Sequence, residues 1–391
     1  MRPPWAKLPE RLAGVNPGAR GRVSENVVVG GRMVRVGDRE KIAALDGGSG
    51  TVASRIGVGT TFTIDQPASG GSDGRAGAGY ARGKAILEAG MGEETAMAMT
   101  LRQIHRYFVG EVAGADLTRP QTPDEIGVIR DAIDRLGVLV FHDQAFTDEQ
   151  QIAFTCALGP IEDSAGGHIA KADERRLGAL MNDVSNLGLD QKPLARDDRK
   201  RMFNLGNRLW HSDSSFRAVP ARYSLLSGRV VATSGGNTEF ADMRAAYDAL
   251  DQATKDEIED LVCEHSLMYS RGSLGFDAFT AEEQKMFRPV RQRLVRTHPA
   301  TGRKSLYLSS HLGTIVGWPV PEARAFIRDL TEHATAPEFV HAHRWRPFDF
   351  VMWDNRQTMH RVRRFDEKEV RDMRRTTIAG DQPTVAQVEA A

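Results

Sequence analysis

Apolar residues recur at helical spacing in several stretches after about residue 100. In "TPDEIGVIRDAIDRLG" (122–137) the aliphatic side chains return every three or four residues and share one face of a helix. Thr122 and Glu125 have the spacing of a capping box, which marks the start of that helix. Thr147 and Gln150 repeat this signal before "TDEQQIAF". Further helices are predicted at 241–250, 254–265 and 321–334.

Short runs of β-branched, aromatic and aliphatic residues separate the predicted helices and are typical of buried strands. These runs are "VLVFHD" (138–143), "RYSLLSGRVV" (222–231), "QRLVRTH" (292–298), "KSLYLSS" (304–310) and "DFVMWDN" (349–355). Strands contributed by many parts of the chain, with helices inserted between them, favour an antiparallel sheet or barrel over a regular βαβ array. The pattern therefore predicts a mainly β fold with helical insertions.

The first part of the chain has a different composition. It is rich in Gly, Arg, Ala and Ser, as in "GGSGTVASRIGVGTTFTIDQPASGGSDGRAGAGYARG", and can bury little surface against its ordering entropy. We expect residues 1–96 to be a largely disordered extension, a linker, a fusion remnant or the product of a start assigned too far upstream, and residues 97–391 to be the folded domain. "GVGTTFTI" is similar to the last glycine box of histidine-kinase ATP-binding domains, but a lone glycine motif is weak evidence.

Charge and cysteine content narrow the class of protein. The 52 basic and 52 acidic residues balance, so no net field attracts nucleic acid or an anionic membrane. Cys156 and Cys263 are too few for a disulfide framework or a cysteine zinc site, which fits a reducing compartment. No stretch approaches the roughly 18 apolar residues of a membrane helix. A cytoplasmic protein with no membrane or nucleic-acid partner is predicted.

The stretch "LWHSDSSF" (209–216) carries the candidate chemistry. His211 and Asp213 are two apart, so an extended backbone sends both side chains to one face. A third ligand is available at His360, which follows the strand-like "FVMWDNRQTMH". Two histidines and one carboxylate form the facial triad of non-haem Fe(II) oxygenases, but zinc hydrolases use the same set. The triad alone leaves both classes open.

Two arginines after His360 favour the oxygenase. Arg371 lies 11 residues on (371−360) and Arg375 lies 15 on (375−360). A guanidinium binds a carboxylate through two parallel hydrogen bonds, which suits a dicarboxylate cosubstrate that reaches away from a metal. A zinc peptidase has no such need. For the neighbouring "RVRR" at 361–364, solvated side chains are the simpler interpretation.

Several motifs together resemble one enzyme family. "LWHSDSSF", "RYSLLSGRVV", "SGGNTEFADMRAAYDAL", "VRTHPATGRK", "MWDNRQTMHR" and "RDMRRTT" occur in consistent order between about residue 100 and about residue 385. They resemble the Fe(II)/2-oxoglutarate dioxygenases of the taurine dioxygenase family, and within it the enzymes that cleave 2,4-dichlorophenoxyacetate, including the alpha-type members. The first 95 or so residues lie outside this resemblance.

The resemblance implies a fold and a cofactor site. The family fold is a double-stranded β-helix, or jelly roll, flanked by helices, and its members are often homo-oligomers. By resemblance, His211, Asp213 and His360 bind Fe(II), and ascorbate stimulates the enzyme. Thr238 and Arg371 match the residues that hold the distal carboxylate of 2-oxoglutarate. Trp353 is expected to border that cosubstrate.

The resemblance also implies which residues contact the substrate. Arg375 matches the arginine that receives the anionic group of the substrate. A looser correspondence makes Lys171, Lys192, Ser214 and His298 substrate contacts, although a solvated residue or a hydrogen bond behind the site explains each of them equally well.

The predicted reaction is hydroxylation of the carbon next to the ether oxygen of an aryloxyacetate such as 2,4-dichlorophenoxyacetate. The products would be a phenol, glyoxylate, succinate and CO2. The presence of Asp213 argues against a halogenase, because a halide needs the position that the carboxylate fills. Alternatives are a taurine, alkyl-sulfonate or other small-anion dioxygenase, and, from another class, a metal-dependent hydrolase or a non-catalytic anion-binding barrel.

Overall fold

The computed structural model describes residues 99–163, Ile169 and 172–387, and also four short strands that precede them. These strands form one antiparallel sheet in chain order: β1 (Glu25–Val29), β2 (Arg32–Gly37), β3 (Lys41–Ala43) and β4 (Ser49–Gly50). The chain divides into two units, Met1–Thr95 and Ala96–Ala391. Apart from the strands, the extension predicted to be disordered lies outside the described residues, as does the glycine motif at 57–64, and both interpretations stay predictions.

A seven-stranded sheet organises the larger unit, in the order β5-β6-β7-β17-β9-β19-β8. Its strands are β5 (Thr100–Gln103), β6 (Gly110–Ala113), β7 (Val138–Phe141), β8 (Asn182–Asp183), β9 (Tyr223–Val230), β17 (Phe350–Asp354) and β19 (Asp372–Ile378). Neighbouring strands are antiparallel, as predicted, except for β6 and β7, which are parallel. Helix α1 (Pro123–Leu136) connects that parallel pair, so the fold contains one βαβ unit that the sequence pattern did not predict.

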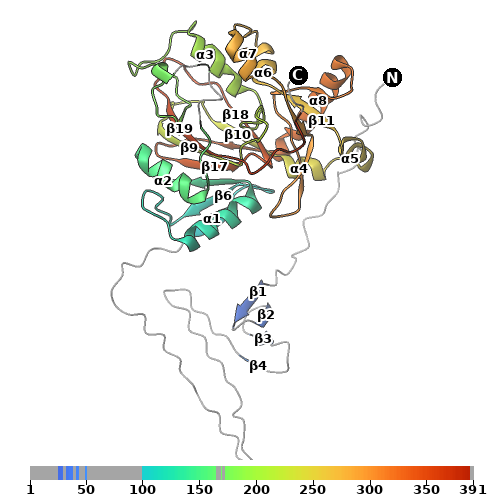
Figure 1. The fold of residues 1–391 in the computed structure, drawn as a ribbon. Helices are drawn as coiled ribbons and strands as arrows, with labels where there is room; N and C mark the ends of the chain where they lie inside the picture. The colour runs from blue at the N-terminus through green and yellow to red at the C-terminus, as the bar shows by residue number, and fades with distance from the viewer. Residues whose placement is uncertain are drawn as a thin grey trace, which may run out of the picture. The chain divides into compact units, whose positions relative to one another are not determined.

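Both faces of the large sheet are buried at its centre, and β7 shows why. Leu139 and Phe141 pack with residues of α1 and α2 (Asp148–Leu158), whereas Val138 and Val140 pack on the other face with Phe240. Phe240 belongs to a second, three-stranded sheet, β16 (Val340–His343), β10 (Thr238–Asp242) and β18 (Thr358–Val362). Figure 1 shows α1 and α2 on one side of β9 and β17 and the strands β10 and β18 on the other. Two sheet layers with helices outside are the predicted architecture.

The remaining elements include those that form two further apolar clusters. They are η3 (Ala172–Glu174), α3 (Arg199–Asn204), η4 (Leu205–Arg208), α4 (Met243–Asp248), α5 (Gln252–Ile258), β11 (Val262–His265), α6 (Leu267–Gly272), α7 (Ala281–Met286), β12 (Val290–Arg293), β13 (Val295–Thr297), β14 (Lys304–Leu306), β15 (Leu312–Ile315), α8 (Val320–Ala334) and η5 (Pro337–Phe339).

The predicted start of α1 is confirmed, because hydrogen bonds of nearby side chains determine it. The hydroxyl of Thr122 accepts from the Glu125 backbone N–H, and the Glu125 carboxylate accepts from the Thr122 backbone N–H, so the predicted capping box starts α1. The prediction of a helix over 254–265 is half wrong. Helix α5 ends at Ile258, and 262–265 form β11, which pairs with β12 and β15. Burial alternates along β11 because successive side chains of a strand point to opposite faces. Within the described residues, none of the helices has the length and apolar character needed to cross a membrane.

Candidate metal centre and active site

Backbone pairing brings two distant histidines together. The segment that follows η4 forms an antiparallel bridge with β18 at His211 and His360. The His211 N–H donates to the His360 carbonyl at 3.0 Å, and the His360 N–H donates back at 2.8 Å. The two imidazole ring centres lie 4.2 Å apart. Sheet pairing therefore places side by side two histidines that the sequence separates by 149 positions (360−211).

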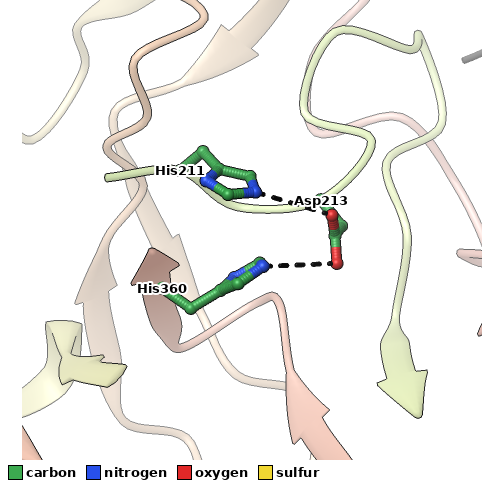
Figure 2. Close-up of side chains that lie close together, drawn as sticks. All are labelled: His211, Asp213 and His360. Carbon is green, nitrogen blue, oxygen red and sulfur yellow. Dashed lines mark ion pairs between the residues drawn. The ribbon is translucent and has the colours of Figure 1, made fainter. Parts of the chain in front are cut away.

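Asp213 completes a buried triad (Figure 2). Its Oδ1 lies 3.9 Å from Nε2 of His211, and its Oδ2 lies 3.7 Å from Nε2 of His360. These ligand atoms all lie within 4.8 Å of one another. The predicted metal ligands are thus brought together with three donor atoms directed at one position, which is the arrangement that a divalent metal requires.

The protonation of the triad also suits a metal. The His211 Nδ1–H donates to the Leu209 carbonyl at 2.7 Å, which leaves the lone pair of Nε2 facing Asp213. Burial lowers the pKa of both His211 and His360, so both imidazoles are neutral at neutral pH. Neutral imidazole is the form that coordinates a metal. The donor set therefore fits Fe(II).

Asp213 is ionised in spite of its burial. Burial by itself raises the pKa of a carboxyl group, but the charge of Arg375, the two histidines and a hydrogen bond from Ser224 together lower the pKa of Asp213 to about 2. Arg375 donates from Nη1 to Oδ1 of Asp213. Its Nε is buried and has no partner among the described residues. The arginine predicted to bind the substrate thus contacts a ligand carboxylate and retains a free donor.

Thr238 and Arg371, predicted to bind 2-oxoglutarate, come from separate elements, because Arg371 immediately precedes β19. Thr238 begins β10, and its buried hydroxyl oxygen accepts from Nε1 of Trp345 at 2.9 Å. Because the oxygen accepts from the indole, the hydroxyl proton of Thr238 remains available for another acceptor. A Cβ added to Gly236, two residues earlier, would lie 3.6 Å from Nε of Arg371. Arg371 therefore lies close to the backbone of Gly236, two residues before Thr238.

Arg371 is a buried cation beside a small pocket. Its guanidinium carbon lies 5.3 Å from the centre of the Phe365 ring, and Nη1 donates to the Val184 carbonyl at 3.2 Å. Burial lowers the pKa of Arg371 to about 10, with Glu367 opposing that shift, so the side chain stays charged at neutral pH. The adjoining pocket has a volume of about 50 Å³, and Val184, Phe365, Glu367 and Arg371 contribute to its lining.

Trp353 borders the metal site. It lies on β17, and its ring centre is 4.6 Å from that of His360 and 5.5 Å from that of Phe240. Its Nε1 donates to the side-chain oxygen of Asn355 at 3.1 Å. Trp353 thus packs directly against one of the histidines of the triad.

Ser214, predicted on the substrate side, follows Asp213 and has a positive φ of 54°. Its hydroxyl donates to Oε1 of Glu162 at 2.7 Å, and Glu162 also lies 3.0 Å from Nε of Arg217. Burial raises the pKa of Glu162, although Arg217 and the bond from Ser214 act in the opposite direction. No motif singles out Glu162, because only the fold brings it to Ser214.

The other three predicted substrate contacts are not brought to the triad by any described contact. Lys171 lies outside the described residues. Lys192 is exposed, and its backbone N–H donates to Asp190 in a turn. His298 is buried and donates from Nε2 to Oδ2 of Asp354 at 3.0 Å. The substrate roles of Lys171, Lys192 and His298 therefore stay predictions.

A second group of possible metal ligands is already paired with an arginine. Asp134, His298 and Asp354 have ligand atoms within 4.8 Å of one another. Nη2 of Arg356 lies 2.9 Å from Oδ1 of Asp134 and 2.6 Å from Oδ2 of Asp354. Because a guanidinium already pairs with both carboxylates, this group is an internal ion-pair network.

Comparisons with known proteins agree with the site. The model of the family described as "Taurine catabolism dioxygenase TauD, TfdA family" matches residues 100–377. The chain is 43% identical over 287 residues to an alpha-ketoglutarate-dependent 2,4-dichlorophenoxyacetate dioxygenase of Cupriavidus pinatubonensis, a match that covers 73% of this chain and 99% of that protein. It is 38% identical over 250 residues to an (S)-phenoxypropionate/alpha-ketoglutarate-dioxygenase of Sphingobium herbicidovorans, covering 62% and 82% respectively.

A solved structure is more similar still. AAD-2, crystallised in complex with Mn(II) and N-oxalylglycine, is 64% identical to this chain. The two structures have a TM-score of 0.73 over 74% of this chain and 100% of AAD-2. The triad and the two arginines all lie within the residues that the family model matches.

Proposed function

This chain belongs to the taurine catabolism dioxygenase TauD, TfdA family, and we propose that it hydroxylates the carbon next to the ether oxygen of an aryloxyacetate such as 2,4-dichlorophenoxyacetate. The enzyme is a 2-oxoglutarate-dependent dioxygenase that uses Fe(II). One O2 oxidises both partners: 2-oxoglutarate becomes succinate and CO2, and the hydroxylated ether collapses to a phenol and glyoxylate.

The observation that carries the proposal is the buried triad in a chain that matches a named 2,4-dichlorophenoxyacetate dioxygenase over nearly all of that protein's length. A second relative of high identity is named for a phenoxypropionate. Taurine or an alkyl sulfonate is the less supported alternative, because these more similar relatives are named for aryloxy acids.

The proposed roles follow from the contacts at the site. His211, Asp213 and His360 would hold Fe(II), which when bound supplies the activation of dioxygen. Arg371 would bind the distal carboxylate of 2-oxoglutarate through parallel hydrogen bonds. Thr238 would add a third, with its proton left free by the indole of Trp345.

The substrate carboxylate is proposed to bind Arg375. Nη1 of this guanidinium is bonded to Asp213, whereas Nε is buried and lacks a partner among the described residues, so a donor remains for an anion. Trp353 would border the cosubstrate, and Ser214 would lie on the substrate side. The roles predicted for Lys171, Lys192 and His298 stay predictions, as do a homo-oligomer and a cytoplasmic location.

The test uses the full chain with Fe(II), ascorbate, 2-oxoglutarate and 2,4-dichlorophenoxyacetate in air, and measures succinate and the released phenol together. Equal amounts of both are expected. Succinate without phenol would overturn the substrate and leave the dioxygenase, and sulfite released from taurine in a parallel reaction would favour the alternative. Absence of succinate with every substrate would overturn the proposed activity.

A further inference from the structure

A closed ring of hydrogen bonds holds the carboxylate of Asp213 from behind. The Ser224 hydroxyl donates to Oδ2 of Asp213 at 2.7 Å. Nδ2 of Asn355 donates to the Ser224 oxygen at 2.9 Å, and the Asp213 backbone N–H donates to Oδ1 of Asn355 at 3.1 Å. The ring therefore starts and ends on Asp213 and passes through two residues that the sequence motifs did not single out.

The chemistry of the groups fixes the direction of each bond. Oδ1 of Asn355 accepts from two N–H groups, those of Asp213 and of the Trp353 indole, so the amide nitrogen must face Ser224. Since the Ser224 oxygen accepts from that nitrogen, its own proton is committed to Asp213. A flipped Asn355 would leave two donors unpaired, which is costly in a buried site.

The members of the ring come from separate parts of the fold. Ser224 lies on β9, Asn355 follows β17, and Asp213 lies in the segment bridged to β18. Ser224 and Asn355 are fully buried, and Asp213 is 4% exposed, so bulk water does not compete for these bonds. The ring thus ties a ligand on an irregular segment to two central strands of the large sheet.

The ring matters because Asp213 has few other restraints. Besides Ser224, its carboxylate accepts from Arg375, one donor for each oxygen. This arrangement fixes the carboxylate plane and directs the oxygens toward the two Nε2 atoms. Residues that orient a metal ligand in this way change metal affinity when they are removed.

We propose that Ser224 and Asn355 are positioning residues that hold Asp213 in its metal-binding orientation and thereby set the affinity of the protein for its divalent metal. This inference rests on the proposed function in one respect: His211, Asp213 and His360 must bind a divalent metal.

The test measures the binding of Mn(II) to the full chain without 2-oxoglutarate, by titration with detection of free Mn(II) by electron paramagnetic resonance. Ser224→Ala is expected to raise the Mn(II) dissociation constant roughly 10- to 100-fold. Ser224→Thr keeps the hydroxyl and is expected to restore most of the affinity. Asn355→Asp has nearly the same shape, but its ionised carboxylate cannot donate to Ser224, and its expected loss is at least as large.

Ser227→Ala is the matched control. Ser227 is another buried serine of β9, and its hydroxyl donates to Gln151 at 2.7 Å, away from the triad. If the two serines contribute only to stability, both alanine variants will lower the melting temperature and neither will change Mn(II) affinity. The proposal requires the affinity to fall in Ser224→Ala alone.

An Mn(II) dissociation constant of Ser224→Ala within twofold of the wild-type value would overturn the proposal, as would equal losses in Ser224→Ala and Ser227→Ala. If the proposed substrate is wrong, the wild-type protein will produce succinate without phenol. That result does not affect the comparison of Mn(II) affinities. A wild-type protein that binds no Mn(II) would overturn both proposals.

Discussion

Replacing Arg371 with lysine separates the charge of this side chain from its shape. Arg371 is 5% exposed, and its guanidinium packs on Phe365 and donates to the Val184 carbonyl, so the position of its fork is defined. Lysine keeps a positive charge but offers a single ammonium in place of two parallel N–H groups. The substitution therefore removes about one charge-assisted hydrogen bond to a bound dicarboxylate.

The size of the effect follows from the loss of about one charge-assisted hydrogen bond. A hydrogen bond to a charged group contributes about 1.5–3 kcal/mol, and about 1.4 kcal/mol corresponds to a tenfold change in affinity. Arg371→Lys should therefore raise the 2-oxoglutarate dissociation constant roughly 10- to 150-fold. Arg371→Gln, which also removes the charge, should have a larger effect.

Calorimetric titration of the Mn(II)-loaded protein with 2-oxoglutarate, without oxygen, measures this constant directly. KM is a poorer readout, because it equals the dissociation constant only when chemistry is slow. Arg374→Lys is the matched control, since Arg374 pairs with Asp148 and Asp372 and should leave the affinity within twofold. A change below threefold in Arg371→Lys, with Mn(II) still bound, would refute the assigned role.

Three further substitutions test other parts of the argument. Trp345→Phe removes the donor to Thr238 and should weaken 2-oxoglutarate binding about fivefold, the equivalent of about one neutral hydrogen bond, while Mn(II) affinity in the same titration stays unchanged. Asp242→Asn leaves the fully buried Arg244 without its carboxylate and should lower the free energy of unfolding in urea by about 3–5 kcal/mol; a loss below 1 kcal/mol would contradict this. The bonds from Arg119 and from the backbone of Thr122 lower the pKa of Glu125 to about 2 from 4.5. Because the folded state has the lower pKa, Glu125→Gln should cost about 0.5–1 kcal/mol at pH 7, and urea titrations at falling pH should show this difference shrinking from about pH 4.5 downward.

The sequence predicted the start of a helix correctly where residues within one short segment determine it. Thr122 with Glu125 and Thr147 with Gln150 start helices as predicted, because a capping box needs only residues three apart. The helix predicted over 254–265 failed at its second half, because pairing of β11 with two neighbouring strands outweighed the helical propensity of 262–265.

The candidate site was predictable as a set of residue types but not as a network. His211 and Asp213 stand two apart, and His360 follows a buried strand, so the triad could be selected from the sequence together with its resemblance. Ser224 and Asn355 are 131 positions apart, and no local pattern links them. His298 was placed on the substrate side by a loose correspondence, and that role stays a prediction. Its bond to Asp354 depends on the fold, because 56 positions separate the two residues.

The contacts of Arg375 explain why an acid, and not a neutral ether, would suit this site. Its guanidinium is rigid and planar, and one of its donors is bonded to Asp213. A carboxylate bound at the free Nε would therefore lie at a fixed offset from a metal ligand. In an aryloxyacetate a single carbon separates the carboxylate from the ether oxygen, so fixing the carboxylate also fixes the position of the carbon to be hydroxylated. A neutral ether lacks that anchor, and its reacting carbon would be free to move relative to the metal, at a large cost in rate.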